Sequence, residues 1–231
     1  MILWLFEFGY VLQHLAIVFQ ILEIKKTKST EGISYETILF FSIATVCRLV
    51  WMWDSMLANF YFAYLELIAA VASLSYIIYL HNQYKVYDYI RQKTPLPAYL
   101  KFPVLLITIL IMAFFFHPGN KNRYYFTIQM FVSTNIYSEC LGLLPQLYLI
   151  GKSSETGNVS AYYLVFLAFA RFFRLFFWFK MYLDGNSFFC LIFADLVHTI
   201  FLCLFIYTYT KNFDSIKLPT FAEENKRTKI F

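Results

Sequence analysis

Eight charged or titratable side chains lie inside long apolar runs of this sequence, where a charge is costly. They are His14, Arg48, Glu66, Glu139, Arg171, Arg174, Asp195 and His198. A charged side chain at the middle of a bilayer costs about 2.5–3.5 kcal/mol on insertion scales, so such groups face a bundle interior and find partners there. The arginines among them suit an anionic group, because a guanidinium can donate two parallel N–H bonds to one carboxylate.

Three of the candidate residues share one face of a helix. Arg171, Arg174 and Trp178 follow the i, i+3, i+7 spacing that stacks side chains along a helix. With Arg48 they form the predicted ligand-binding set, in a polar cavity that opens to one side of the membrane and holds an anion.

Internal ion pairing is the alternative for the same charges. Arg48 or Arg171 could pair with Glu139, and Asp195 could pair with His198 one helical turn later. Both interpretations stay open at the level of the sequence.

Two further features suggest motion or regulation. His14 could titrate between about pH 5 and 8 beside an acidic group and act as a switch, although a neutral buried histidine is the simpler interpretation. Pro145 and Gln146 lie late in an apolar segment, where a proline permits a kink or hinge. We find no nucleophile–base set, metal-ligand spacing or phosphate loop, so we expect neither an enzyme nor a cofactor.

The composition is that of a membrane protein. Of 231 residues, 60% are hydrophobic and 14% are charged, whereas a soluble domain has about 25% charged residues. A globule of this size could not bury so much apolar surface, so lipid must cover it. The net charge of +5 falls mostly in expected loops, which we interpret as a sign of orientation and not of nucleic-acid binding.

Seven apolar segments are candidate membrane-spanning helices. We expect them at residues 3–23, 36–53, 58–80, 102–116, 125–150, 161–183 and 187–210, before a polar tail at 211–231. The predicted fold class is an all-α integral membrane protein with seven transmembrane helices. The fourth segment is short, so six helices and a re-entrant segment are the alternative. The four cysteines lie inside these segments without metal spacing and are interpreted as small buried apolar residues.

Lys and Arg residues divide the loops into two sets. The first, third and fifth loops and the tail hold Lys25, Lys26, Lys28, Lys85, Arg91, Lys93, Lys101, Lys152, Lys211, Lys217, Lys226, Arg227 and Lys229. The other side holds Lys121 and Arg123. The positive-inside rule therefore predicts a luminal N-terminus and a C-terminus in the cytoplasm, or in an equivalent space such as the mitochondrial matrix.

An internal repeat organises the helices. Residues 18–49 align without a gap with residues 144–175, at a constant offset of 126 residues. The polar matches include Gln20 with Gln146, Lys26 with Lys152, Ser34 with Ser160 and Arg48 with Arg174. We expect two parallel three-helix repeats, at about 3–80 and 125–210, joined by a linker helix at about 102–116.

The chain resembles the KDEL receptor family, the ER lumen protein retaining receptors. The matching segments are QHLAIV (13–18), KTKSTEGIS (26–34), ATVCRL (44–49), YLHNQYKVYD (79–88), IYSECLGLLPQLYLIGKS (136–153) and HTIFLCLFIYTY (198–209). The resemblance implies two three-helix repeats and a luminal N-terminus. It also implies a receptor that binds a C-terminal K-D-E-L-type peptide in the acidic Golgi and returns its cargo to the ER.

Carried over by position, the resemblance implies roles for five residues. Arg48 matches the arginine that takes the peptide's terminal carboxylate, and Arg171 and Trp178 match pocket positions. His14 matches the pH-sensing histidine, and Glu139 matches the acidic residue coupled to it.

Other positions depart from the family pattern. Glu7 and Met181 stand where the family has signal-binding arginines. Trp51 and Leu204 replace aspartates, Ala170 and Arg174 replace tyrosines, and Phe177 replaces an asparagine. Losing two cations should weaken recognition of an ordinary K-D-E-L signal by several kcal/mol, at about 1.5–3 kcal/mol for each charged hydrogen bond.

Three functions are compatible with this sequence. The first is a divergent sorting receptor in the ER and Golgi, whose partner is a C-terminal signal peptide. The second is an accessory or scaffold subunit of a large membrane complex, for instance in the mitochondrial inner membrane, that kept the fold and lost the ligand. The third is a small-solute carrier, suggested by the likeness of the predicted fold to SWEET transporters.

Overall fold

The computed structural model describes residues 2–30, 32–53, 61–84, 96–118, 127–152, 159–185 and 188–217. These residues form a bundle of helices and contain no strand. The elements are α1 (Ile2–Thr27), α2 (Tyr35–Met52), α3 (Tyr61–Tyr84), η2 (Ala98–Leu100), α5 (Phe102–Phe115), α6 (Ile128–Gly142), α7 (Leu144–Lys152), α8 (Ala161–Leu183) and α9 (Phe189–Lys217). Most of the predicted tail, 218–231, lies outside the described residues.

Four described helices are long and apolar enough to cross a membrane: α1, α2, α3 and α9. Together with the composition, they make the chain a helical membrane protein. Two other expected membrane-spanning helices, α5 and α8, do not meet both conditions of length and apolar composition. α5 has 14 residues, and α8, although 23 residues long, contains two buried arginines.

The expected continuous helix at 125–150 is wrong in one respect. α6 ends at Gly142 and α7 begins at Leu144, so a break falls at Leu143. Pro145 explains the break, because proline has no N–H for the carbonyl four residues earlier and its ring crowds that carbonyl. The prediction for 161–183 is confirmed by α8, which Ser160 precedes in an extended conformation.

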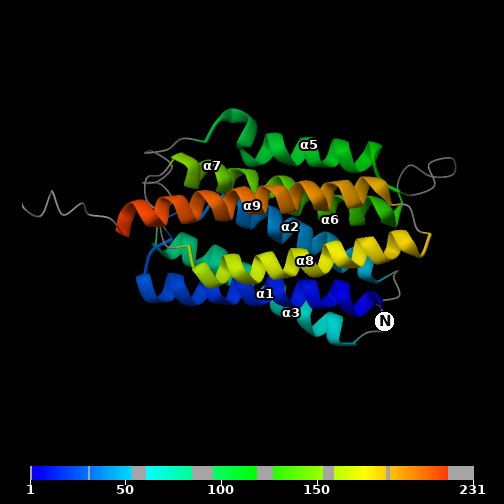
Figure 1. Ribbon diagram of the computed structural model, residues 1–231, viewed down its shortest axis with the longest axis horizontal. Coiled ribbons are helices and arrows are strands. Elements are labelled where there is room, and N and C mark those ends of the chain that lie inside the picture. The colour runs from blue at the N-terminus through cyan, green and yellow to red at the C-terminus, as the bar shows by residue number, and fades with distance from the viewer. Residues whose placement is uncertain are drawn as a thin grey trace, which may run out of the picture.

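The helices lie roughly parallel to one long axis (Figure 1). α1 packs most extensively against α8, and α2 against α6, while α5 lies at the outside of the bundle. α1 begins at the right-hand end of Figure 1 and α9 ends at the left-hand end. The start of the first helix and the end of the last helix therefore lie at opposite ends of the bundle.

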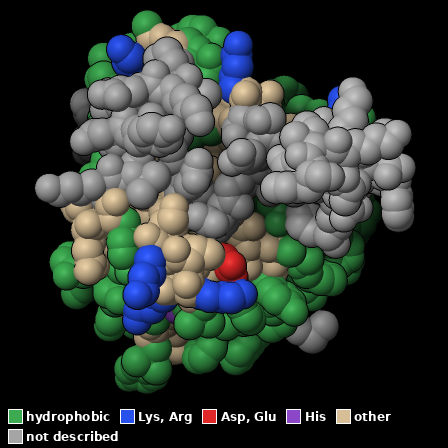
Figure 2. Space-filling view, turned by 90° about the vertical axis from the view of Figure 1, so that its left-hand side faces the viewer, with side chains coloured by type: hydrophobic (Ala, Val, Ile, Leu, Met, Phe, Trp, Pro, Cys, Tyr) green, Lys and Arg blue, Asp and Glu red, His purple; other side chains and the backbone are tan. Residues whose placement is uncertain are grey.

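The left-hand end of the bundle carries basic side chains. Figure 2 views this end and shows Lys and Arg groups around its rim. Lys25 and Lys26 lie in the last turn of α1, Lys152 ends α7, and Lys101 precedes α5. These four lysines thus lie at the same end of the bundle, as the division of basic residues in the sequence predicts.

Large apolar side chains cover the outside of the bundle. On α8, for example, Phe169, Phe172, Phe176 and Phe179 are exposed, as expected for a surface in contact with lipid. The prediction that all four cysteines are buried is wrong: Cys140 is buried and Cys47 is partly so, but Cys190 and Cys203 are exposed on α9. Apolar residues on a lipid-facing helix need not be inside the protein.

Candidate functional site

The buried charges gather in two clusters inside the bundle. The Arg48 cluster consists of Glu7 on α1, Arg48 and Trp51 on α2, and Glu66 on α3. The Arg171 cluster consists of Gln13, Glu139, Arg171, Arg174, Trp178 and Asp195, from α1, α6, α8 and α9. All of these side chains are less than 9% exposed.

The Arg171 cluster is a closed network of two guanidiniums and two carboxylates. Arg171 Nη1 donates to Glu139 Oε2 at 3.1 Å and to Asp195 Oδ1 at 3.2 Å. Arg174 forms ion pairs with the same two carboxylates, to Glu139 Oε2 and, at 3.2 Å, to Asp195 Oδ1. The four charges therefore balance within one buried site.

Neutral donors and acceptors complete this network. Gln13 Nε2 donates to Glu139 Oε1 at 3.2 Å, and Gln13 Oε1 accepts from Arg171 Nη2 at 2.9 Å. Trp178 Nε1 donates to Asp195 Oδ2 at 2.8 Å. Every oxygen of the two carboxylates thus accepts a hydrogen bond, and each guanidinium forms an ion pair with both carboxylates, as stable burial of charge requires. Arg171 Nε, Arg174 Nε and Arg174 Nη2 have no hydrogen-bond partner among the described residues.

The Arg48 cluster is open by comparison. Arg48 Nη2 donates to Glu66 Oε2 in a buried ion pair. Arg48 Nε and Nη1, Trp51 Nε1 and Glu7 Oε1 are buried and have no hydrogen-bond partner among the described residues. Most buried polar groups in proteins are paired. Both clusters have unpaired donors, but an unpaired carboxylate oxygen is found in the Arg48 cluster and not in the Arg171 cluster, within the described residues.

Tyr10 on α1 lies between the two clusters. The guanidinium of Arg48 lies 3.9 Å from the centre of its ring, and that of Arg174 lies 5.1 Å from it. The Tyr10 hydroxyl accepts a hydrogen bond of 3.0 Å from Asn135 on α6. Gly9 lets the side chain of Arg174 lie close to α1, because a Cβ at Gly9 would lie 2.9 Å from the Cγ of Arg174.

The structure settles the internal ion pairs that the sequence left open. The pairing of Arg171 with Glu139 is confirmed. The pairing of Arg48 with Glu139 is wrong, because Arg48 contacts Glu66. The pairing of Asp195 with His198 is also wrong: Asp195 binds the two arginines, and neither ring nitrogen of His198 has a hydrogen-bond partner in the described part of the chain.

Two glutamines tie the helices together nearer the end of α1. Gln20 Oε1 accepts from the Ser160 backbone N–H at 3.0 Å, and Gln146 Oε1 accepts from the Ser34 backbone N–H at 2.6 Å. Gln146 Nε2 also donates to the Gly32 carbonyl at 2.5 Å. We call these two contacts the glutamine clamps; each one fixes the residue just before a long helix, α8 or α2.

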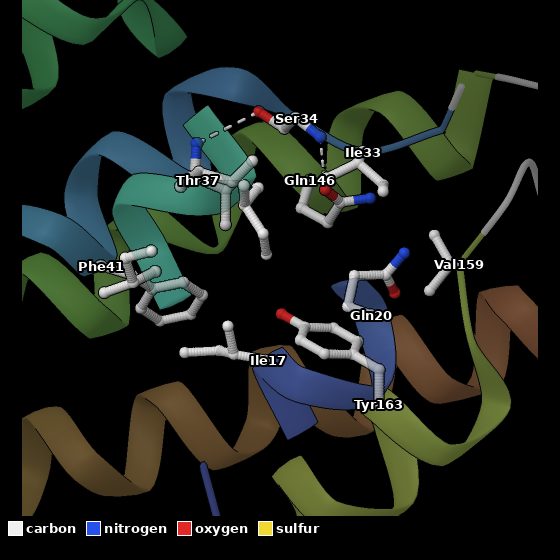
Figure 3. Close-up of a pocket in the computed structure, with 12 residues that line it drawn as sticks. Ile17, Gln20, Ile33, Ser34, Thr37, Phe41, Gln146, Val159 and Tyr163 are labelled. Atoms are coloured by element: carbon white, nitrogen blue, oxygen red, sulfur yellow. Dashed lines mark hydrogen bonds between the residues drawn. The ribbon is translucent and has the colours of Figure 1, made fainter. Parts of the chain in front are cut away.

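A cavity of about 30 Å³ lies beside the clamps. It is lined by Ile17, Gln20, Ile33, Ser34, Thr37, Ile38, Phe41, Leu74, Ile77, Gln146, Val159 and Tyr163, and Figure 3 shows the Tyr163 hydroxyl pointing into it. Its volume suits about two water molecules. The predicted ligand-binding arginines do not line this cavity; they lie further toward the start of α1.

The predicted switch and hinge residues lie in different surroundings. His14 is half-buried, and its Nδ1 lies 3.3 Å from the Ser73 hydroxyl on α3. No described hydrogen bond joins His14 to Glu139, whose partners are Gln13, Arg171 and Arg174. Pro145 follows the break between α6 and α7, and Gln146 forms one of the glutamine clamps.

The amino-acid sequence is similar to those of known receptors. The family model of the ER lumen protein retaining receptor matches residues 29–181, about two thirds of the chain. The chain belongs to the ER lumen protein retaining receptor family. ER lumen protein-retaining receptor 2 of Homo sapiens and of Bos taurus are each 28% identical over 200 residues, which cover 86% of this chain and 89% of the relative. The ER lumen protein-retaining receptor of Drosophila melanogaster is 24% identical over 208 residues, which cover 89% of this chain and 92% of the relative.

The match to the retaining receptor family covers some cluster residues and not others. Arg48, Glu66, Glu139, Arg171 and Arg174 lie inside the matched residues, as does Trp178. Glu7, His14 and Asp195 lie outside them. The roles that the resemblance implied for individual residues therefore remain proposals.

Several residues of the site had no assigned role in the sequence. Gln13, which joins Arg171 to Glu139, is one of them, and Glu66, the partner of Arg48, is another. The repeat offered one usable signal for Gln13, since Gln13 and Glu139 are separated by the same 126 residues as the repeats. Glu66 has no such signal, because its partner lies on a neighbouring helix and depends on how α2 and α3 are rotated.

Proposed function

We propose that this chain is a divergent retention receptor that binds the C-terminal carboxylate of a luminal peptide at Arg48. The observation that carries the proposal is the open state of Arg48, whose Nε and Nη1 are buried without partners. Arg174 also has two nitrogens without a hydrogen bond, but Arg171 and Arg174 are each neutralised by two carboxylates, whereas Arg48 forms an ion pair with Glu66 alone. An open guanidinium suits a carboxylate, which needs donors of this kind.

Membership of the retaining receptor family supports this assignment. The proposed compartment is the ER–Golgi system, with Golgi-to-ER retrieval of the bound protein as the outcome. The basic end of the bundle supports a cytoplasmic location for the end of α1 and the end of α9. The start of α1, with Glu7 and the Arg48 cluster nearby, would then lie toward the lumen.

The architecture that we propose is two parallel three-helix repeats joined by α5. The glutamine clamps support it, because they are related by the repeat: Gln20 corresponds to Gln146, and Ser160 to Ser34. Each repeat thus donates one glutamine to the helix start of the other. The contact of Gln13 with Glu139, corresponding residues of the two repeats, is what an axis of pseudo-symmetry between them would produce.

The other predicted site residues have a supporting part in this proposal. Arg171, Arg174 and Trp178 hold α8 against α6 and α9 and keep the pocket in shape. His14 lies one turn beyond Tyr10 and within electrostatic range of Arg48, so its protonation would add positive charge near the bound carboxylate. Glu139 would be coupled to it indirectly, through Gln13 on the same helix as His14.

A binding experiment with matched peptides tests the proposed function. Full-length protein in a mild detergent is titrated with a fluorescent peptide that ends in a free carboxylate and, separately, with its C-terminal amide. We expect the free carboxylate to bind about 10- to 100-fold more tightly, the equivalent of about 1.5–3 kcal/mol for charge-assisted hydrogen bonds. Arg48→Gln should abolish this difference, and Arg48→Lys should retain the charge but lose the paired donors.

Lys26→Gln is the control, because Lys26 is exposed at the far end of α1 and pairs only weakly with Glu23 at 4.0 Å. Equal binding of the acid and the amide would overturn the proposal. Absence of any peptide binding, with recovery of the protein in one large membrane complex, would favour an accessory subunit instead.

A further inference from the structure

The Arg48 cluster has unpaired groups of both kinds. Its unpaired donors are Arg48 Nε and Nη1 and Trp51 Nε1, and its unpaired acceptor is Glu7 Oε1. Glu7 is 2% exposed, Arg48 3% and Trp51 7%. Although Glu7 lies within electrostatic range of Arg48, the two side chains do not bond to each other. A ligand that satisfied the whole cluster would therefore bring an acceptor for Arg48 and a donor for Glu7.

The two clusters also differ in how their charges balance. The Arg171 cluster balances two guanidiniums with two carboxylates. The Arg48 cluster has one guanidinium, already paired with Glu66, and a second carboxylate in Glu7. Glu7 is thus the one carboxylate of the two clusters without a cationic partner among the described residues. A buried carboxylate of this kind favours a cation, because it has little water to solvate it.

The surroundings of Glu7 also suit the aliphatic part of a peptide. The ring of the adjacent Phe6 lies 4.7 Å from that of Phe177 and 6.2 Å from that of Trp51, measured between centroids. Trp178 adds a third ring, 6.3 Å from Phe6. Aromatic rings of this kind bind the methylene stem of a lysine and attract its ammonium through their faces.

We propose that Glu7 binds a basic side chain of the peptide whose terminal carboxylate binds Arg48. The ligand class is therefore a C-terminal peptide with Lys or Arg at one of the two positions before its last residue, where a K-D-E-L signal is acidic. This inference rests on the proposed function and adds the identity of the residue read beside the carboxylate. Because the cluster is buried, a peptide reaches it only when α1 moves away from α2 and α3.

Peptides that differ at one residue test this preference. Six-residue peptides ending in a free leucine carboxylate carry Lys, Gln or Glu at one of the two preceding positions, and each is titrated against the full-length protein in detergent. At one position we expect Lys to bind at least about tenfold more tightly than Gln, and Glu more weakly than Gln. Acetylating that lysine, which removes its charge, should abolish the gain on the unaltered protein.

The protein variant Glu7→Gln should lose the preference for the Lys peptide over the Gln peptide. Glu23→Gln on the same helix is the matched control and should keep it, because Glu23 lies near the opposite end of α1. Equal binding of Lys and Glu peptides, or a Lys preference that survives acetylation or Glu7→Gln, would overturn the inference while leaving carboxylate binding at Arg48 intact. If the free carboxylate gives no advantage over the amide, the proposed function fails and this inference fails with it.

Discussion

Arg48 and Arg174 occupy corresponding positions of the predicted repeats, but their surroundings are opposite in kind. Arg174 belongs to a closed network in which two carboxylates bind two guanidiniums. Arg48 has one carboxylate partner, Glu66, and lies beside Glu7, which has no cationic partner among the described residues. A balanced network of charges holds helices together, whereas a cluster with unpaired charges can accept a ligand. The difference supports the proposal that the Arg48 cluster binds the ligand and the Arg171 cluster supports the fold.

The largest effect should come from breaking the closed network. Glu139→Gln leaves Arg171 and Arg174 short of one negative charge in a site where Arg174 is completely buried. Removing one partner of a buried ion pair costs about 3–5 kcal/mol. We expect a loss of this size in the free energy of unfolding, measured by denaturation in detergent. A loss below about 1 kcal/mol would mean that the network does not support the fold.

The control for that variant lies on the surface. Glu23→Gln removes a carboxylate whose only described ion pair is with Lys26, at 4.0 Å and largely exposed. Exposed ion pairs contribute about 0–1 kcal/mol. The two glutamate variants therefore separate the effect of burial from the effect of losing a negative charge.

The second effect tests whether Glu66 competes with a ligand for Arg48. Glu66→Gln removes the internal carboxylate from the open cluster and should cost about 1.5–3 kcal/mol of stability, the value of a charged hydrogen bond. It should also raise the affinity for a peptide carboxylate about tenfold, because Arg48 is freed. Titration with the acid and the amide of one peptide measures the change. An unchanged or lower affinity for the acid would contradict competition.

The sequence predicted that these charged side chains are buried, but it did not predict which of them form ion pairs with each other. Arg48, Glu66, Arg174 and Asp195 were all recognised as buried because each interrupts an apolar run. Which of them meet depends on the rotation of each helix about its axis, and a run that is apolar on every side does not specify that rotation. The same limit explains the exposed cysteines Cys190 and Cys203.

The repeat alignment predicted more of the structure than the apolar pattern did, because it also relates the starts of helices. α6 begins at Ile128 and α8 at Ala161, which are 126 residues after the starts of α1 and α2 at Ile2 and Tyr35. Gln20 and Gln146 are paired by the alignment, and both side chains accept a backbone N–H at a helix start. The location of the cavity beside the clamps was missed, because it depends on packing among five segments distant in sequence.

A third prediction tests the two glutamine clamps. Gln146→Leu leaves the Ser34 N–H and the Gly32 carbonyl without the partner that each has now, and Gln20→Leu does the same to the Ser160 N–H. A buried polar group without a partner costs about 1–3 kcal/mol. We expect each variant to lower the free energy of unfolding by an amount in this range, measured by denaturation in detergent. An unchanged free energy of unfolding in either variant would mean that the corresponding clamp does not stabilise the fold.

The smallest effect on stability should come from His14. Its ring is half-buried and has one described contact, to the Ser73 hydroxyl at 3.3 Å, so His14→Gln should cost about 1 kcal/mol or less. Its effect on binding should be larger. Protonated His14 adds positive charge near Arg48 and stabilises a bound carboxylate, so affinity should rise as the pH falls through the pKa of His14.

The ratio of peptide affinities at pH 5.5 and pH 7.4 measures this effect. It should exceed one in the unaltered protein and fall to nearly one in His14→Gln, while Ser73→Ala, which keeps the histidine, should leave it above one. A pH dependence that persists in His14→Gln would assign the titration to another group, and Glu7 and Glu66 are the remaining acids of the open cluster. Because Glu139 sits in the closed network, its pairing with two arginines makes it a poor candidate for that role.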